Sequence, residues 1–460
     1  MPVPRRPAPL MLPTRRSFLG GVAAGAAAGT LFGGTGVHAA GSEEIRVALV
    51  GCGGRGGGAA VDALSAAKAP LKVVALADVF GQRIDAVRRS LTEQFQDRVD
   101  VPEERAFVGF EAYRQAMDAL RPGDIVILAT PPAFRAAHFA AAIEKGLHVF
   151  MEKPVSIDGP STSRIISLAG KADEKNLKVG VGLMCRHCDR RRELFDRLQN
   201  GEAGELLSFY GHRMHPAAQS MDLFPGPPEG MTELQWQVKR FHGFIWASGG
   251  IYSDYYVHHI DEVCWMRGAW PVMAEAVGGR HFQGKMPDQN FDNYAVEYTF
   301  PDGTKFFYDG QHIKEGVKKF GVYGSGTKGA FTISTHKHSP GKPTIYKGQA
   351  MTKDAIVWTA EQPEPNPYRR EWEHLVEAIV NDTPYNEAVR GAEASLATAM
   401  GRFAAHTGRA ITYDEMLKLE DDLTAGVESL KDDSPAPLAR LEDGGYPVPM
   451  PGRYKFEYHD

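Results

Sequence analysis

Lys153, Asp254 and His258 carry side chains that together suit proton transfer at a substrate hydroxyl group. Lys153 lies in the motif Glu152-Lys153-Pro154, directly after the predicted strand 148–151. In a doubly wound sheet, residues just past the carboxyl end of a strand line the ligand crevice. A lysine in that position can donate a hydrogen bond to the reacting oxygen of a substrate. When this motif is taken alone, a surface ion pair between Glu152 and Lys153 is the better explanation.

The second group of ionisable residues lies on one predicted helix. Asp254, His258 and Asp261 are spaced i, i+4, i+7, so they share one helix face with Trp265. Burying ionisable groups is costly unless they act together. An imidazole beside carboxylates can accept a hydroxyl proton while the carbon-bound hydride leaves. A structural role for Asp261, such as holding His258 or a neighbouring backbone group, remains an equal alternative. The spacing does not match H-E-x-x-H, and no metal site is predicted.

A glycine-rich turn of the form G-x-G-x-x-G precedes both groups. Its residues are Gly51, Cys52, Gly53, Gly54, Arg55 and Gly56. Such a turn between a strand and a helix lets the backbone approach a pyrophosphate at the helix amino end. Asp78 ends the next predicted strand, where a carboxylate accepts hydrogen bonds from the adenosine ribose and repels a 2′-phosphate. NAD is therefore favoured over NADP, although the nearby Arg83 leaves NADP open.

Alternating strands and helices must position these residues. Between residues 45 and 185, apolar strands are predicted at 45–50, 71–77, 125–129, 148–151 and 178–183, with helices at 57–67, 83–94, 110–117, 133–145 and 161–174. This alternation predicts βαβ units and a doubly wound parallel sheet, the Rossmann arrangement.

From about residue 205 the pattern changes. Strands are predicted at 206–212, 272–277, 293–300, 304–308 and 319–323, followed by helices at 368–381 and 391–406. Pro301-Asp302-Gly303 supplies a hairpin turn between two of the strands. An α+β domain with a large, open, mainly antiparallel sheet is expected here.

The first residues resemble a twin-arginine export signal. Thr14-Arg15-Arg16-Ser17-Phe18-Leu19 precedes a Gly/Ala run, and Val37-His38-Ala39 has the small residues of a cleavage site. The predicted parts are a signal peptide over 1–39, an NAD(P)-binding domain over 40–185, a substrate and oligomerisation domain over 186–412, and an arm over 413–460. A periplasmic or otherwise exported location follows, with the twin-arginine export machinery as a partner. Because nicotinamide is not freely supplied outside the cytoplasm, a tightly bound cofactor is expected.

Charge and cysteine content narrow the remaining possibilities. The leader carries four arginines and no acidic residue, so its removal takes the formal charge at pH 7 from −5 to −9. That charge argues against nucleic acid or an anionic membrane as a partner. No later apolar stretch is long enough to span a membrane. The cysteines Cys52, Cys185, Cys188 and Cys264 are too few for a disulfide scaffold. The pair at 185 and 188 reads as buried or incidental thiols, with a local disulfide left open.

Several of these segments together resemble the glucose–fructose oxidoreductase/inositol dehydrogenase family (Gfo/Idh/MocA), in particular its secreted members. They are Gly51–Gly56, Thr130-Pro131-Pro132 with His138, Gly146–Pro154, Gly201–Glu205 and Gly249–Asp261. The resemblance implies a nicotinamide cofactor, a sugar or polyol substrate, and a dimer or tetramer formed through the second domain's sheet. It gives Lys153, Asp254 and His258 catalytic roles, and histidine at position 258 is typical of polyol-oxidising members. It adds Thr130, Pro131, Pro132, His138, Glu152 and Lys153 to the cofactor site.

The function expected from these features is an exported oxidoreductase. It would take a hydride from a sugar or polyol onto bound NAD and return it to a second carbonyl compound. The candidate substrate contacts, besides Asp254 and His258, are Arg186, His187 and Trp246, with His212 and His215 as weaker candidates. One alternative is a redox-neutral, NAD-dependent glycoside hydrolase or lyase that oxidises the sugar transiently. The other is a non-catalytic sugar- or nucleotide-responsive binding protein on the same fold.

Overall fold

The computed structural model describes residues 44–452, except 67, 217, 225, 281–287 and 443. The predicted signal peptide over 1–39 lies outside the described residues. Within the described part, no helix is both long and apolar enough to cross a membrane.

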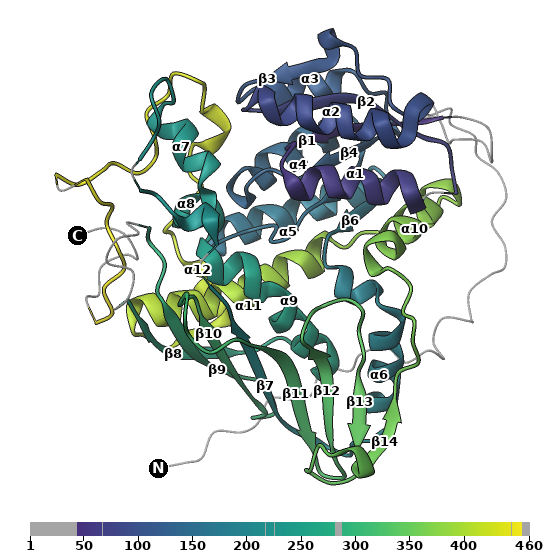
Figure 1. The fold of residues 1–460 in the computed structure, drawn as a ribbon, viewed down its shortest axis with the longest axis vertical. Helices are drawn as coiled ribbons and strands as arrows, with labels where there is room; N and C mark the ends of the chain where they lie inside the picture. The colour runs from purple at the N-terminus through teal and green to yellow at the C-terminus, as the bar shows by residue number, and fades with distance from the viewer. Residues whose placement is uncertain are drawn as a thin grey trace, which may run out of the picture. The chain divides into compact units, whose positions relative to one another are not determined.

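The first sheet has six parallel strands in the order β3-β2-β1-β4-β5-β6 (Figure 1). The strands are β1 (Ile45–Val50), β2 (Leu71–Asp78), β3 (Ala106–Val108), β4 (Ile125–Leu128), β5 (His148–Met151) and β6 (Val179–Val181). This order confirms the predicted doubly wound sheet, because strands are added outward from β1 in one direction up to β3 and in the other direction from β4 on. β3 was not predicted, since its short, half-exposed run Ala-Phe-Val has no strand pattern of its own.

Helices cover this sheet, and one of them comes from far along the chain. The helices of the first segment are α1 (Gly54–Ala66), α2 (Gly81–Phe95), α3 (Ala112–Asp118), α4 (Arg135–Glu144) and α5 (Gly159–Glu174). α10 (Pro367–Val380) packs beside α1, and its Trp372 stacks on Phe150 of β5 at 4.4 Å between ring centroids (Figure 1). The helix predicted within 186–412 therefore completes the cover of the nucleotide-binding sheet.

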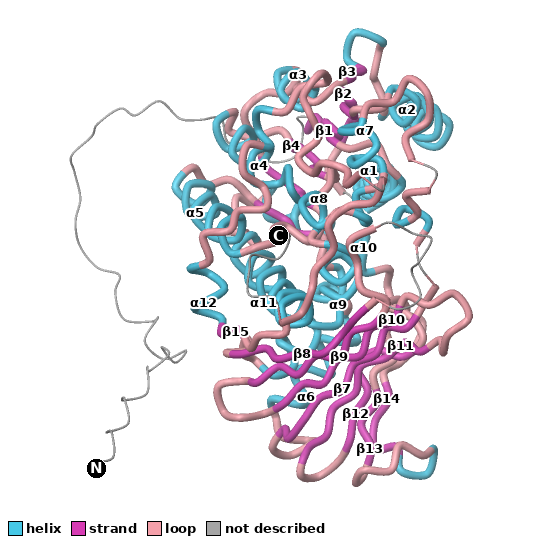
Figure 2. The backbone as a smooth tube through the Cα atoms, turned by 90° about the vertical axis from the view of Figure 1, so that its left-hand side faces the viewer, coloured by secondary structure: helices cyan, strands magenta, loops and turns pink. Residues whose placement is uncertain are grey.

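The second sheet has nine strands in the order β14-β13-β12-β11-β7-β10-β9-β8-β15 (Figure 2). They are β7 (Leu206–Met214), β8 (Met273–Gly279), β9 (Asn293–Thr299), β10 (Lys305–Gln311), β11 (Lys319–Gly326), β12 (Ala330–Thr335), β13 (Thr344–Tyr346), β14 (Ile356–Thr359) and β15 (Ile411–Thr412). β7 and β10 pair in parallel, whereas the other neighbours are antiparallel. The predicted large, mainly antiparallel sheet is confirmed. The hairpin between β9 and β10 turns at Gly303, whose φ is +87°.

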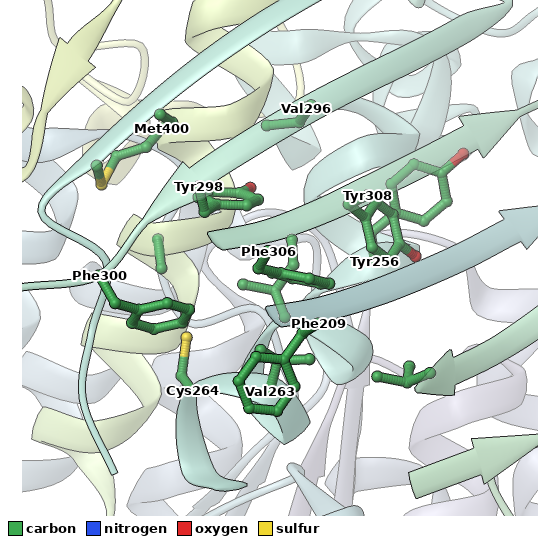
Figure 3. Close-up of a cluster of buried hydrophobic side chains, with 14 of the residues drawn as sticks. Phe209, Tyr256, Val263, Cys264, Val296, Tyr298, Phe300, Phe306, Tyr308 and Met400 are labelled. Atoms are coloured by element: carbon green, nitrogen blue, oxygen red, sulfur yellow. The ribbon is translucent and has the colours of Figure 1, made fainter. Parts of the chain in front are cut away.

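One face of this sheet packs on α9 (Gly250–Arg267) and α11 (Ala388–Thr407). Figure 3 shows the core between them, with Phe209, Tyr298 and Phe306 from the strands and Met400 from α11. α9 is buried along nearly its whole length. Its polar residues at 254 and 258 are therefore held inside the protein by a rigid helix.

The remaining helices of the described part are α6 (Asp189–Gln199), α7 (Glu233–Lys239), α8 (Ile245–Ser248) and α12 (Tyr413–Lys418). Beyond α12, residues 419–452 have little regular structure, yet they are held by specific contacts (Figure 1). Arg164 of α5 pairs with Asp422 at 2.7 Å, and Arg440 pairs with Glu233 of α7 at 2.9 Å. The described part of the predicted arm thus packs on its own chain.

Candidate active site

The glycine-rich turn connects β1 to α1 as predicted, and its geometry fits a dinucleotide. A Cβ on Gly51 would lie 2.6 Å from the Ala129 carbonyl carbon, and one on Gly56 would lie 1.9 Å from the Gly51 carbonyl oxygen. Nothing lies within 4 Å of a Cβ built on Gly53 or Gly54. The outer glycines therefore allow the strand and helix to pack closely. The inner ones leave open space before the free N–H groups at the start of α1, where a pyrophosphate binds.

Asp78, at the end of β2, is held in place by the turn that it faces. The N–H groups of Cys52 and Phe80 donate to its two carboxylate oxygens at 2.7 and 2.9 Å. Each oxygen keeps a lone pair for a ribose hydroxyl. Arg83 Nη1 lies 3.9 Å from the carboxylate, so a cation stands close enough to contribute to cofactor choice.

A pocket opens beside Asp78 at the carboxyl ends of β1, β2 and β4, where an adenosine lies in folds of this kind. Three predicted residues, Thr130, Pro131 and His138, line it together with Phe110 and other residues. The ring of His138 stacks on Tyr113 at 4.1 Å. Burial, with Arg135 and Arg114 nearby, lowers the pKa of His138 to about 3, so its imidazole is neutral. Pro132 begins the following 3₁₀ turn (Pro132–Phe134).

Glu152 and Arg55 form an ion pair next to the glycine-rich turn. The Arg55 Nε lies 2.8 Å from Glu152 Oε1, and its guanidinium lies 5.0 Å from the centre of the Tyr368 ring. The predicted surface pair of Glu152 with Lys153 is absent among the described contacts. Glu152 is directed instead toward Gly182 at the end of β6, where a Cβ would lie 2.6 Å from its carboxylate.

Lys153 and Asp254 meet across 101 residues of sequence. Lys153 Nζ donates to the backbone carbonyl oxygen of Asp254 at 2.8 Å and lies 3.5 Å from its Oδ1. His242 Nε2 donates to Oδ2 at 2.9 Å. Burial would raise the pKa of Asp254, but Lys153 and His242 hold it well below its usual range. Asp254 therefore stays ionised and fixes both neighbouring side chains.

His258 follows Asp254 by one helical turn. Its side chain is 93% buried, with 7% exposed, and its Nδ1 has no hydrogen-bond partner among the described residues. Burial, assisted by His338, Lys153 and Arg213, holds its pKa well below 6.5. The imidazole is thus neutral at physiological pH and has an unpartnered nitrogen that can accept a proton.

Most of the other residues predicted to contact the substrate are paired with other side chains of the protein. Arg186 forms a bidentate pair with Asp261 at 2.7 and 2.9 Å, so Asp261 holds this arginine and not His258. His187 is buried between His374, at 2.8 Å, and Glu387, at 3.3 Å. The side chains of Arg186 and His187, which were predicted to contact a substrate, are therefore paired within the protein.

Two further candidates also have protein partners, and a third belongs with the site. Trp246 donates to Gln237 Oε1 at 2.8 Å and packs edge-on against Phe134. His212 Nδ1 lies 3.1 Å from Asp309 on the strand β10. His215 instead stacks on Tyr255, the residue after Asp254, at 5.1 Å between ring centroids.

Sequence reasoning missed several residues around His258. They are Arg213, His242, Tyr255, His312 and His338. No local spacing connects Arg213, His242, His312 and His338, because they lie in separate segments of the chain, whereas Tyr255 lies on α9 itself, close to His258. The position of Arg213 and His312 at strand ends on the helix-packed side of the sheet was the one available signal.

All four cysteines are buried free thiols, and Cys185 and Cys188 lie next to this cluster. Cys185, Glu262 and His338 bring ligand atoms within 4.8 Å of one another. Arg191 Nε pairs with Glu262 at 2.9 Å, and Arg213 donates to His338 Nε2 at 2.9 Å, which leaves the proton of His338 on Nδ1. Partners within the protein therefore explain why Cys185, Glu262 and His338 lie close together. Cys188 hydrogen-bonds to Glu364 and accepts from Arg191 at 3.1 Å, so the local disulfide left open by the sequence is not formed.

Acidification should destabilise the protein because several buried histidines are neutral. Burial lowers the pKa of His138, His258, His312 and His338 below the 6.5 of an unfolded chain. As the pH falls, the unfolded state therefore binds protons before the folded state does. The free energy of unfolding has its full value above pH 6.5 and decreases below it. His138, whose pKa is about 3, alone contributes about 2 kcal/mol of loss between pH 6.5 and 5, and the other three histidines act in the same direction. Thermal unfolding midpoints at pH 7 and pH 5 measure this loss of stability. His338→Gln should reduce the difference between the two midpoints. A midpoint that stayed level at pH 5 would contradict the prediction.

Comparison with known proteins agrees with this fold. Residues 45–183 match the Gfo/Idh/MocA model, described as an oxidoreductase family with an NAD-binding Rossmann fold. Inositol 2-dehydrogenase of Corynebacterium glutamicum is 26% identical over 234 residues, which cover 51% of this chain and 57% of that protein. The chain spans about half the length of the curated relatives that it matches.

Solved structures extend the likeness of fold across both sheets. Aldose-aldose oxidoreductase from Caulobacter crescentus has a TM-score of 0.62 at 17% identity, covering 80% of this chain and all of that one. Scyllo-inositol dehydrogenase from Lactobacillus casei, with bound NAD(H) and scyllo-inositol, has a TM-score of 0.59 at 20% identity, covering 81% of this chain and all of that one. Residues 45–183, with their six-stranded sheet and glycine-rich turn, therefore match the NAD-binding Rossmann fold of the Gfo/Idh/MocA oxidoreductase family.

Proposed function

We propose that this protein is an exported oxidoreductase that acts on a hydroxyl group of a sugar or polyol and keeps its nicotinamide cofactor bound. One observation carries the proposal: Lys153 Nζ lies 2.8 Å from the Asp254 carbonyl oxygen, one helical turn from the unpartnered imidazole of His258. A hydrogen-bond donor and a neutral proton acceptor thus lie side by side near the carboxyl edge of the nucleotide-binding sheet. The sugar and polyol enzymes among the relatives support the choice of substrate.

The chain's own residues can carry the proton chemistry of this reaction. Nicotinamide, when bound, accepts the hydride that leaves the substrate carbon with its electron pair. Lys153 would donate to the substrate oxygen and stabilise its developing negative charge. His258 would accept the hydroxyl proton, so that the C–H and O–H bonds become a carbonyl. Asp254 would hold the ammonium in place. In the reverse half-reaction, His258 returns the proton to a second carbonyl compound as that compound receives the hydride.

Retention of the cofactor is supported by what covers the adenosine pocket. Val238 of α7 lines that pocket, and Phe110 and Phe134 join one buried apolar cluster with Trp246, Val427 and other residues. This cluster combines the segment around α7 and α8 with the C-terminal segment. A bound dinucleotide could leave only if this packed cover opened, which would slow its release. NAD is the expected cofactor because of Asp78, and Arg83 leaves NADP open.

Export and assembly complete the proposal. The twin-arginine motif supports export to the periplasm or beyond, and such export carries a folded protein together with its cofactor. The outer face of the second sheet exposes apolar side chains, among them Val277 at 73% and Tyr210 at 44%. Exposed apolar residues on a sheet face are typical of a subunit contact. A homodimer or homotetramer through this face fits that surface.

The experiment that tests the function uses isolated protein without added dinucleotide. It is incubated with panels of aldoses and inositols, each paired with a second carbonyl sugar, and the products are separated by mass. The proposal predicts equal amounts of oxidised and reduced product. Cleavage of a glycoside without net oxidation would establish the redox-neutral hydrolase or lyase instead. Binding of a sugar without any product would identify a binding protein.

A further inference from the structure

Arg213 is a second cation that, like Lys153, contacts α9 one turn before His258. It is on β7 and, like the buried Phe209 and Gly211, points to the face of the sheet that packs on α9. Its Nη1 donates to the carbonyl oxygen of Tyr255 at 2.7 Å. Lys153 donates to the preceding carbonyl, that of Asp254, at 2.8 Å. Consecutive carbonyls of a helix are turned about 100° from each other. The two cations therefore approach α9 from different directions at the turn that leads to His258.

His338 connects Arg213 to the catalytic histidine. The same Nη1 donates to His338 Nε2 at 2.9 Å, and the His338 ring lies 4.7 Å from the His258 ring between centroids. Arg213 is also among the charges that lower the pKa of His258, after burial and His338. A substituent on a substrate bound at His258 is thus within reach of this guanidinium.

Arg213 has no carboxylate partner in the described part of the chain. Two other arginines that face α9 do: Arg186 pairs with Asp261, and Arg191 pairs with Glu262. The Nη1 atom makes both of its hydrogen bonds, whereas Nε and Nη2 make none with the described residues. That second edge of the guanidinium has the geometry that binds a carboxylate through two parallel hydrogen bonds.

Aromatic rings keep this edge in a fixed orientation. The guanidinium lies 4.8 Å from the centre of the Tyr255 ring and 5.6 Å from that of Phe320. A partly buried cation held in this way loses hydration without gaining an anion. Binding a negatively charged group would compensate that loss.

His215 adds an acceptor beside Arg213. Its Nδ1 donates to the Pro216 carbonyl oxygen at 2.6 Å, which leaves the proton-free Nε2, and that atom is buried without a partner among the described residues. Burial, opposed by the Pro216 carbonyl and assisted by Arg213, lowers the pKa of His215 to about 4. A neutral imidazole of this tautomer accepts a hydrogen bond from a sugar hydroxyl.

From this geometry we infer that Arg213 binds a carboxylate of the substrate, so that the preferred substrates are sugar acids such as uronates. The inference rests on the proposed function, because it assumes that the reacting hydroxyl lies between Lys153 and His258. Arg213 would then select the substrate, and His215 would accept from one of its hydroxyl groups.

The test compares D-glucuronate and D-galacturonate with the parent hexoses D-glucose and D-galactose, using the full chain with its cofactor. Turnover gives kcat/KM, and calorimetry gives binding separately. The wild-type protein should prefer at least one uronate over its hexose by about tenfold or more, and Arg213→Gln should lower kcat/KM for that uronate by about 100-fold. Arg213→Lys should retain an intermediate preference, because it keeps the charge but not the planar pair of donors.

Arg197→Gln provides the matched control. Arg197 also lies over an aromatic ring, that of Trp358 at 4.5 Å, but it is paired with Glu193 and Glu202 on α6 and its C-terminal loop. Its replacement should leave the preference for uronates unchanged. An equal loss for uronate and hexose in Arg213→Gln would overturn the inference, since it would indicate a structural role.

The outcomes separate this inference from the proposed function. Oxidation of hexoses without any preference for uronates would retain the function and overturn the carboxylate site. Binding of a uronate that Arg213→Gln abolishes, with no oxidation of either sugar, would retain the site and overturn the function. If no uronate binds more tightly than its hexose, including the case in which none binds, the inference is wrong.

Discussion

Lys153→Ala should reduce turnover by about 10³-fold while leaving the cofactor content unchanged. The loss has two physical causes. The reacting oxygen loses its hydrogen-bond donor, and the buried carboxylate of Asp254 loses its cation, although His242 still donates to it at 2.9 Å. Because the glycine-rich turn and Asp78 are separate from Lys153, the dinucleotide should bind as before. Product formation per chain and nucleotide released on denaturation measure the two effects independently.

Lys145→Ala is the matched control for this variant. Lys145 follows α4, and its side chain is 50% exposed and pairs with Asp118. Its replacement should leave turnover within the error of the assay. Turnover that survived unchanged in Lys153→Ala would remove this lysine from the reaction. A parallel loss of nucleotide would instead make Lys153 a cofactor-binding residue.

His258→Gln should reduce turnover by about 10²- to 10⁴-fold, the range expected when a general base is removed. Glutamine keeps much of the volume and polarity of the imidazole, so the core around α9 should remain folded. Burial, with His338, Lys153 and Arg213, keeps the pKa of His258 low, so the wild-type rate should hold on the acid side of neutrality. The rate–pH profile of the variant should lose the acid limb that reports this group.

His212→Gln controls for the loss of a histidine from the same region. His212 lies on β7 and pairs with Asp309, away from Lys153 and His258. Wild-type turnover and an unchanged pH profile are expected for it. If His258→Gln kept both its rate and its acid limb, another group would have to accept the proton.

The sequence predicted the nucleotide-binding half of the molecule well, because its signals are local. Gly51, Gly56 and Asp78 each occupy a position defined by the adjoining strand, and the structure has them at the turn from β1 to α1 and at the end of β2. β12 was missed, and so were β3 and the short strands β13 to β15, whose runs of two to four residues have no readable period.

The second half was harder, since its determining contacts are distant in sequence. Lys153 and Asp254 were each singled out, yet their hydrogen bond spans 101 residues and no spacing predicts it. The helical spacing suggested that Asp261 could hold His258, whereas in the structure Asp261 pairs with Arg186. α9 is buried on all sides, so its sequence has no polar stripe that would indicate which face meets the substrate.

Whether the nicotinamide cofactor stays bound during turnover tests the proposed function most directly. Freshly isolated protein would be assayed for bound nicotinamide dinucleotide before and after prolonged turnover of a sugar pair, in buffer containing an enzyme that destroys free dinucleotide. The account predicts a stoichiometric amount of nucleotide in both samples and undiminished turnover. Protein that is empty when isolated, and that turns over only while dinucleotide is supplied from outside, would contradict it.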